Sequence, residues 1–328
     1  MMIALLYPGQ GSQHTGMGKF LCDNFKLANH IFEEASDAIK VDLKKLCFDA
    51  PESELTLTQN SQPALLTVST ATSRVLNSLV PIKPIAAAGH SAGEYAAAVN
   101  AEALEFTAAV RAVRIRGEAM QEAVPAGVGG MAAIMGMTSE HVEAICDWVN
   151  KTSGAGPLEP ANYNAPGQIV ISGTKAAITW LQQNYAPNKV PGVSGRLKLI
   201  PLKVSAPFHC SMMKPAELRM AEVLKQMTFR DARHPIVQNV TAEPVTEAEL
   251  LRQNLIKQIA SPVRWNECVE RLRAMGVDTF IEAGCGRVLS GLTKKIDSNV
   301  LNTFNINSKE ELLAFETAFN NDSSVPRN

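Results

Sequence analysis

The stretch that decides the fold is Ile85-Ala86-Ala87-Ala88-Gly89-His90-Ser91-Ala92-Gly93, in which an apolar run leads into the pattern Gly-x-Ser-x-Gly. Such a run is typical of a short buried strand, and the residues from Glu94 to Val99 continue it with a helix-forming segment. A serine between a strand and a helix lies on a tight turn, and its hydroxyl projects at the N-terminus of the helix. The same letters also fit a plain glycine-rich turn. Ser91 is therefore a candidate nucleophile that needs support from other residues.

Strands and helices alternate on both sides of this turn. The N-terminal side has a predicted strand at 3–7 and helices at 27–47 and 63–80, the last ended by Pro81. The C-terminal side continues with predicted helices at 105–123, 214–227, 247–259, 264–275 and 287–296, and strands at 236–240 and 278–282. This alternation predicts an α/β fold with a mostly parallel sheet.

A segment in the middle of the chain has a different texture. Between Pro125 and Pro207 the sequence predicts strands at 130–136, 168–172 and 197–204, helices at 139–151 and 174–184, and a Gly/Pro-rich loop at 152–160. The pattern resembles a small ferredoxin-like unit. We therefore expect residues 125–203 to be a subdomain inserted into a larger domain of residues 1–124 and 204–318, with a polar tail at 319–328.

The composition argues against several classes of function. The 31 Lys and Arg residues nearly balance the 32 Asp and Glu residues, so no electrostatic footprint for nucleic acid is visible. No stretch approaches the roughly 20 apolar residues of a membrane-spanning helix, and the start does not resemble a signal peptide. The six cysteines are scattered, and the histidines form no metal-binding pair. We expect a cytoplasmic protein without a metal site.

A nucleophilic serine needs a base, and His209 is the best placed of the six histidines. It follows the predicted strand that ends at 204, and loops at strand ends are where an α/β core places its site residues. His90 adjoins Ser91, so its side chain must point away from the serine. A lone histidine in a loop is more often an ordinary residue than a base, so His209 remains a hypothesis at this point.

Arg116 lies in an apolar setting on the predicted helix 105–123. The residues one turn away from it are Ala112, Val113, Ala119 and Met120. Such an arginine either extends along apolar side chains to reach water or binds a buried anion. A guanidinium suits a carboxylate because two parallel N–H donors match two oxygens. Periodicity alone favours the solvent-reaching interpretation.

The segment Gly9-Gln10-Gly11 follows the first predicted strand. It lacks the Gly-Lys-Ser/Thr ending of a phosphate loop. Its backbone could donate an N–H group to an oxyanion, or the segment could be a simple tight turn. Composition does not separate these two interpretations.

Eight segments together resemble one family. They are Pro8-Gly9-Gln10-Gly11-Ser12-Gln13, Gly89-His90-Ser91-Ala92-Gly93-Glu94-Tyr95, Arg116-Gly117 with Met120-Gln121, Met131-Ala132-Ala133-Ile134, the stretch from Asn164 to Gly173, the stretch from Ala206 to Pro215, Pro262-Val263-Arg264-Trp265, and the stretch from Glu282 to Leu289. In this order they are similar to the malonyl-CoA:acyl carrier protein transacylases and the acyltransferase domains of polyketide and fatty acid synthases. The resemblance covers nearly the whole chain.

The resemblance implies a role for each matching position. Ser91 attacks the malonyl thioester and His209 accepts its proton, while Arg116 pairs with the free malonyl carboxylate. The backbone N–H groups of Gln10 and Ala92 hold the oxyanion. No aspartate completes a triad, because in this family a backbone carbonyl orients the histidine, here that of Gln258.

The resemblance also implies the fold and the partners. The fold is an α/β-hydrolase-like domain carrying a ferredoxin-like subdomain. The substrates are malonyl-CoA and the phosphopantetheine thiol of acyl carrier protein, the kinetics are ping-pong, no cofactor is needed, and the protein is a monomer that serves fatty acid biosynthesis.

Two positions bear on selectivity. Ala92 is smaller than the Leu, Ile or Val that usually follows the nucleophile, so the pocket wall there is expected to be looser. Phe208 precedes the histidine as in malonyl-selective domains, and its ring would crowd an α-methyl group. Acidic carrier proteins call for a basic rim near the entrance. The candidates for this rim are Lys189, Arg196, Lys198, Arg287, Lys294 and Lys295.

Three alternatives remain at this stage. A serine acyl hydrolase would use Ser91 and His209 but would have no need of Arg116. A malonyltransferase acting in trans for a polyketide synthase, or one serving a malonate decarboxylase, would share the chemistry and differ in its carrier. A non-enzymatic interaction module would have no use for a strained serine turn or an arginine in an apolar setting.

Overall fold

The computed structural model describes residues 1–204, 206–300 and 302–321, and its larger sheet has the strand order β10-β9-β1-β2-β7-β8. These strands are β1 (Ile3–Tyr7), β2 (Ala86–Gly89), β7 (Ile236–Val237), β8 (Pro244–Val245), β9 (Thr279–Glu282) and β10 (Asn302–Asn305). All are parallel to their neighbours except β8, which pairs with β7 antiparallel. The predicted mostly parallel α/β sheet is confirmed.

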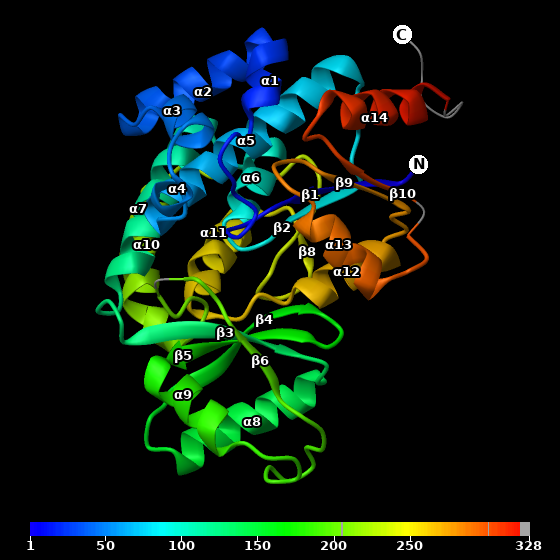
Figure 1. Ribbon diagram of the computed structural model, residues 1–328. Coiled ribbons are helices and arrows are strands. Elements are labelled where there is room, and N and C mark those ends of the chain that lie inside the picture. Colours follow the sequence, from blue (N-terminus) through cyan, green and yellow to red (C-terminus); the bar gives the residue numbers. More distant parts are fainter. Residues whose placement is uncertain (205, 301, 322–328) are drawn as a thin grey trace.

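Helices cover both faces of this sheet (Figure 1). They are α1 (Lys19–Asn24), α2 (Lys26–Ile39), α3 (Leu43–Phe48), α4 (Glu52–Leu55), α5 (Thr58–Leu79), α6 (Gly93–Asn100), α7 (Phe106–Glu122), α10 (Lys214–Lys225), α11 (Ala248–Lys257), α12 (Trp265–Ala274), α13 (Val288–Ile296) and α14 (Lys309–Asn321). Short 3₁₀ turns at Ser211–Met213 and Gln258–Ala260 complete this part.

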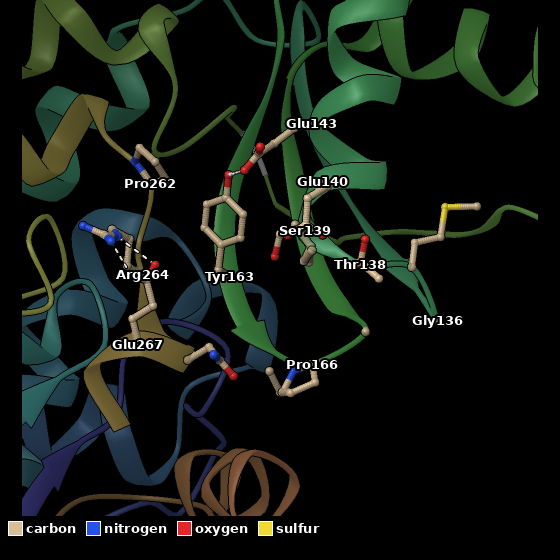
Figure 2. A pocket seen from close by; sticks show the side chains of 15 residues that line it. Gly136, Thr138, Ser139, Glu140, Glu143, Tyr163, Pro166, Pro262, Arg264 and Glu267 are labelled. Atoms are coloured by element: carbon tan, nitrogen blue, oxygen red, sulfur yellow. Dashed lines mark hydrogen bonds and ion pairs between the residues drawn. The ribbon is translucent and has the colours of Figure 1, made fainter. Parts of the chain in front are cut away.

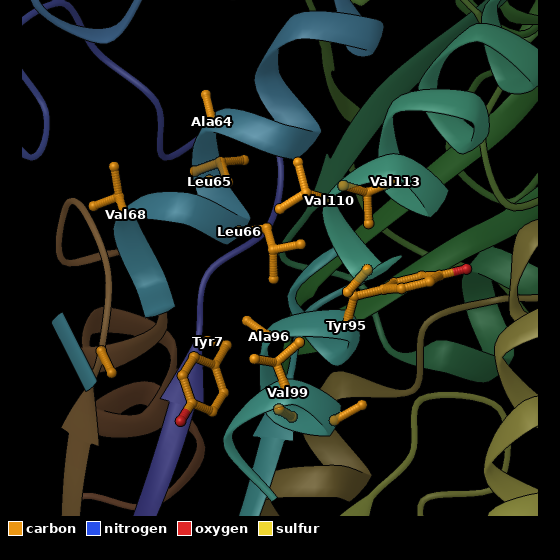
Figure 3. Packing of buried hydrophobic residues seen from close by; sticks show 14 of the residues in the cluster. Tyr7, Ala64, Leu65, Leu66, Val68, Tyr95, Ala96, Val99, Val110 and Val113 are labelled. Atoms are coloured by element: carbon orange, nitrogen blue, oxygen red, sulfur yellow. The ribbon is translucent and has the colours of Figure 1, made fainter. Parts of the chain in front are cut away.

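The largest apolar core lies where α5, α6 and α7 meet the sheet. Figure 3 shows Tyr7 of β1, Leu66 of α5, Tyr95 of α6 and Val113 of α7 in this core, and all four are buried. Burial of such apolar surface is the main force that fixes these helices against the strands. Arg116 lies one turn beyond Val113 on α7, so the same packing positions it.

The smaller sheet is antiparallel, with the order β4-β5-β3-β6. Its elements follow one another as β3 (Gly129–Met135), α8 (Ser139–Thr152), β4 (Leu158–Ala165), β5 (Gln168–Thr174), α9 (Lys175–Asn184) and β6 (Lys198–Pro201). This βαββαβ order is ferredoxin-like. The unit lies at one end of the molecule (Figure 1), and β4 bonds to the larger unit through Tyr163 N to Val263 O at 2.9 Å and Val263 N to Ala161 O at 2.8 Å.

Several boundaries differ from the sequence prediction, and those below have a physical reason. The predicted loop 152–160 gives way at Leu158 to β4, where Pro160 is tolerated because β4 is an edge strand. The predicted strand 236–240 ends at Val237, because Gln238 and Asn239 turn their polar groups toward other partners. Helix α14 was not predicted and continues through the buried Phe319 into the expected tail, of which 322–328 lie outside the described residues.

Helix α5 begins five residues before the predicted start, so Pro63 lies inside it. A proline in a helix leaves the carbonyl four residues earlier without its N–H donor. That carbonyl belongs to Gln59, and Arg114 Nη1 of α7 donates to it at 3.2 Å. The arginine thus supplies the bond that the proline removes, and α5 continues without interruption.

Candidate active site

Ser91 lies directly after β2 in a left-handed backbone conformation, with φ of 51°. Gly89 and Gly93 are required on either side of Ser91 because other backbone atoms lie too close to them for a side chain to fit. A Cβ atom on Gly89 would lie 2.0 Å from the Gly93 carbonyl carbon, and one on Gly93 would lie 2.1 Å from Tyr7 O. No side chain fits at either position, so the turn packs directly against β1 and projects Ser91 beyond the carboxyl end of the sheet.

Ser91 and His209 meet as the sequence predicted. The Ser91 Oγ lies 2.8 Å from His209 Nε2, and His209 Nδ1 lies 2.9 Å from the backbone oxygen of Gln258. A carbonyl only accepts, so Nδ1 carries the hydrogen and Nε2 is free to accept a proton. The serine, the imidazole and the carbonyl form a chain that can pass a proton to and from Ser91.

Arg116 is buried, with 1% of its surface exposed, so the solvent-reaching interpretation is wrong. Its Nη1 donates to Gln62 Oε1 at 2.8 Å, and its Nη2 donates to Gln258 Oε1 at 2.8 Å and to Ser91 Oγ at 3.2 Å. Its Nε is buried without a hydrogen-bond partner in the described part of the chain. A buried cation with a free donor beside a reactive serine is suited to receive an anion.

Burial shifts the pKa values of the site. Desolvation, with the positive charge of Arg116 next, lowers the pKa of His209 to about 3. Desolvation also lowers the pKa of Arg116, against the opposing influence of Tyr95 and Glu94. Burial raises the pKa of Glu94 to about 8, while hydrogen bonds from Asn239 and Gln258 and the charge on Arg116 act in the other direction. His209 is therefore a neutral base at physiological pH.

These groups line a cavity of about 150 Å³. Its walls include Ser91, His209 and Arg116, together with Gln10, Ala92 and Phe208. Ala92 is the N-cap of α6, so its N–H group belongs to the N-terminal end of that helix. Gln10 follows β1, whose Tyr7 pairs with Gly89 of β2. The sheet register thus brings the two predicted oxyanion residues to the same cavity.

The six residues of the predicted basic rim lie elsewhere. All are exposed, and none lines the cavity that contains Ser91. Arg287 pairs with Glu311, Lys189 Nζ donates to Asn184 O at 2.7 Å, and Lys295 Nζ donates to Gln168 Oε1 at 3.1 Å. Part of this charge is therefore engaged within the chain, and a shared role for the six stays a prediction.

A larger hollow of about 750 Å³ lies apart from Ser91 (Figure 2). Tyr163 donates to Glu143 there, and Arg264 pairs with Glu267 across from them. Along β4, Tyr163 lines this hollow while Asn162 and Asn164 line the smaller cavity, so successive side chains separate the two spaces. In the smaller cavity a base and a cation both contact the hydroxyl of one serine, so we take it as the candidate active site.

Several residues of the site were not predicted. Gln62 holds one end of Arg116, and Asn239 accepts the Ser91 N–H at 2.8 Å through Oδ1 and donates to Gly89 O at 2.8 Å. Asn164 Oδ1 lies 2.9 Å from His90 Nε2, and both residues line the cavity that contains Ser91. A signal for Asn239 was available, because it follows β7 just as Ser91 follows β2.

Comparison with known proteins agrees with this geometry. The model of the acyl transferase domain matches residues 4–299. The chain is 45% identical to the malonyl CoA-acyl carrier protein transacylase of Bacillus subtilis over 318 residues, covering 96% of each chain. It is 43% identical to the protein of the same name from Staphylococcus aureus, covering 90% of this chain and 93% of the relative. The chain belongs to the malonyl-CoA:acyl carrier protein transacylase family.

Solved structures of this transacylase family share the fold. An acyl carrier protein S-malonyltransferase from Vibrio cholerae superposes with a TM-score of 0.88 at 38% identity, covering 96% of this chain and 100% of the other. A malonyl-transacylase in complex with the acyl carrier protein of a type II polyketide synthase superposes with a TM-score of 0.90 at 39% identity, covering 97% of this chain and 100% of the other.

In the described residues, no helix combines the length and apolar character needed to cross a bilayer.

Proposed function

We propose that this transacylase transfers a malonyl group from malonyl-CoA to the phosphopantetheine thiol of acyl carrier protein, through an ester on Ser91. The observation that carries the proposal is the contact of Arg116 Nη2 with Ser91 Oγ at 3.2 Å, inside the cavity that His209 also lines. A buried guanidinium beside the nucleophile selects an acyl group that carries its own carboxylate.

The first half-reaction forms the ester. His209 Nε2 takes the Ser91 proton while Oγ attacks the thioester carbonyl, and the N–H groups of Gln10 and Ala92 stabilise the oxyanion. When the tetrahedral intermediate collapses, the carbon–sulfur bond breaks and His209 returns its proton to the CoA sulfur. The products are free CoA and a malonyl ester on Ser91.

The second half-reaction reverses these steps with a new thiol. His209 accepts the proton of the carrier thiol, the sulfur attacks the ester, and the proton passes to Ser91 Oγ as the ester bond breaks. The serine is restored and the carrier leaves as a malonyl thioester. Because CoA departs before the carrier reacts, the kinetics are ping-pong.

Arg116 acts on the acyl group and on the base in this scheme. A malonyl carboxylate bound to its guanidinium would offset the positive charge that contributes to the low pKa of His209. The imidazole would then hold a proton more readily while the substrate is bound, as general base catalysis requires. Phe208, which is buried on the same cavity wall, would exclude an α-methyl group.

We further propose the setting of the reaction. Residues 1–124 and 204–318 form the catalytic domain, and 125–203 an inserted subdomain, as the separate strand sets of the two sheets support. The six unpaired cysteines support a reducing, cytoplasmic compartment. The enzyme serves fatty acid biosynthesis as a monomer without a cofactor, and the basic rim meets the acidic carrier.

A carrier of a polyketide synthase is the second candidate acceptor. The observation that supports this candidate is the structural similarity to a malonyl-transacylase whose structure was solved with a type II polyketide carrier. The two candidates share every step at Ser91 and differ only in the surface that meets the carrier. Relative kcat/KM values for the two holo-carriers decide between them.

The test uses malonyl-CoA with and without a phosphopantetheinylated fatty acid carrier protein. We expect CoA release to be matched by malonyl-carrier formation, with little free malonate in either reaction. Release of free malonate alone, with no malonyl-carrier, would instead support the serine hydrolase.

A further inference from the structure

Glu94 is a buried carboxyl group that the steps above do not use. It follows Gly93 in the first turn of α6, and only 1% of its surface is exposed. Both of its oxygens face donors: Oε1 accepts from the backbone N–H of Asn239, and Oε2 accepts from Gln258 Nε2 at 2.5 Å. Two donors require the ionised form, and these hydrogen bonds with the charge on Arg116 oppose the burial that raises the pKa of Glu94. A carboxyl group is costly to bury, so this placement calls for an account of what the group does.

Gln258 connects Glu94 to the rest of the site. Its backbone oxygen accepts from His209 Nδ1 at 2.9 Å, and its side-chain Oε1 accepts from Arg116 Nη2 at 2.8 Å. Its Nε2 donates to Glu94 and lies 3.1 Å from Ser91 O. One residue thus contacts the base, the cation and the nucleophile.

The orientation of the Gln258 amide decides whether Arg116 has a partner. Arg116 carries donors only, so it needs the oxygen end of the amide. The nitrogen end must then face an acceptor, and Glu94 Oε2 is that acceptor. If the amide turned over, its NH₂ group would face the guanidinium and its oxygen would face the Glu94 carboxyl, so both hydrogen bonds would be lost.

We infer that Glu94 is a positioning residue: it fixes the Gln258 amide so that Arg116 is held where a substrate carboxylate can bind beside Ser91. The inference rests on the proposed function, and it adds the residue that keeps the site selective for acidic acyl groups. The same carboxylate also anchors Asn239, whose side chain holds the Ser91 N–H and Gly89 O.

The first test is Glu94→Gln, which keeps the shape but offers one oxygen and one NH₂ group. One of the two donors, Asn239 N–H or Gln258 Nε2, then meets a donor. We expect kcat/KM for malonyl-CoA to fall about 10- to 100-fold, mainly through KM, and that for acetyl-CoA to fall only a few-fold. An equal fall for the two substrates would overturn the inference.

The matched control is Glu282→Gln. Glu282 is also fully buried, and its oxygens accept from Leu289 N at 3.0 Å and Ser290 N at 2.8 Å, away from Arg116. This variant should lose stability comparably, while the malonyl-to-acetyl ratio stays at the wild-type value. A ratio that shifted as in Glu94→Gln would mean that any buried carboxylate produces the effect, and would overturn the inference.

A double-mutant cycle separates positioning from structure. In the Arg116→Ala background, Glu94→Gln should have no further effect on the malonyl-to-acetyl ratio, because the group that it positions is absent. Independent, additive effects on that ratio would contradict the inference. If wild-type enzyme failed to transfer malonyl at all, the proposed function would fall instead, so the two failures are distinguishable.

A second variant covers the case in which Glu94→Gln does not fold. The double variant E94Q/Q258E exchanges the two groups, so that the amide at position 94 donates to the carboxylate at position 258, and that carboxylate faces Arg116. We expect a folded protein whose ratio of malonyl to acetyl transfer falls as it does in Glu94→Gln, because the guanidinium is already neutralised. Recovery of malonyl transfer to the wild-type rate would show that the amide orientation is irrelevant.

Discussion

Arg116 Nη2 and His209 Nε2 both lie within hydrogen-bond distance of the same atom, Ser91 Oγ, at 3.2 Å and 2.8 Å. The guanidinium only donates, so Oγ must accept from Arg116, and its hydrogen is left to point at His209. The cation thereby orients the hydroxyl for proton transfer before any substrate binds. When an acyl carboxylate arrives, the same donors are close enough to bind it.

Removing the cation should cost the enzyme its acidic substrate. Arg116→Ala should lose roughly 2–5 kcal/mol of transition-state stabilisation for malonyl transfer, as when one partner of a buried charge pair is truncated. Transfer of acetyl should suffer less, because a neutral group makes no pair with Arg116. The measurement is kcat/KM for both substrates with carrier protein as acceptor. Equal losses for malonyl and acetyl would show that Arg116 does not bind the carboxylate.

The low pKa of His209 predicts an unusual pH profile for the acylation step. The base works only when neutral, and a pKa lowered to about 3 keeps it neutral well below the ordinary histidine value. Therefore kcat/KM for malonyl-CoA, which reports the free enzyme, should show no loss near the ordinary histidine pKa of about 6.5 that is due to this residue. The imidazole resonance of His209, assigned by comparison with His209→Asn, should likewise not titrate between about pH 5 and 8. A titration midpoint near the ordinary value would contradict this prediction.

Phe208 should control the size of the acyl group. It is buried on the cavity wall next to the base. Phe208→Leu should raise the ratio of methylmalonyl to malonyl transfer roughly 5- to 150-fold, which corresponds to the 1–3 kcal/mol that one methyl group is worth in a pocket. Competition between the two CoA esters, read by mass spectrometry of the carrier, measures the ratio. An unchanged ratio would assign the exclusion of the methyl group to another wall.

The sequence predicted local features of the fold better than distant contacts. The strand, turn and helix around Ser91 follow from a run of apolar residues and two glycines, and the structure confirms them. The predicted helix start at Pro63 was wrong, because α5 runs through this proline and Arg114 comes from 51 residues further along the chain to bond Gln59 O. The residues near Pro63 in the sequence do not indicate this contact from a distant arginine.

The site shows the same limit. Periodicity favoured the wrong interpretation of Arg116, since its burial depends on Gln62 and Gln258, which lie on other elements. Glu94 belongs to the segment 89–95 that resembles the family. No residue near it in the sequence indicates that its partners are Asn239 and Gln258, which lie 145 and 164 positions away. The position after a predicted strand made His209 the best placed of the six histidines, but only the family resemblance gave it the role of base.

The most direct test of the account is the mass of the intact enzyme after mixing with malonyl-CoA alone. We predict a single malonyl adduct on the wild type that maps to Ser91 and disappears when holo-carrier protein is added, with the same malonyl mass gained by the carrier. Ser91→Ala should carry no adduct. An adduct that survives in Ser91→Ala, or one that the carrier cannot remove, would contradict a malonyl transfer that passes through Ser91.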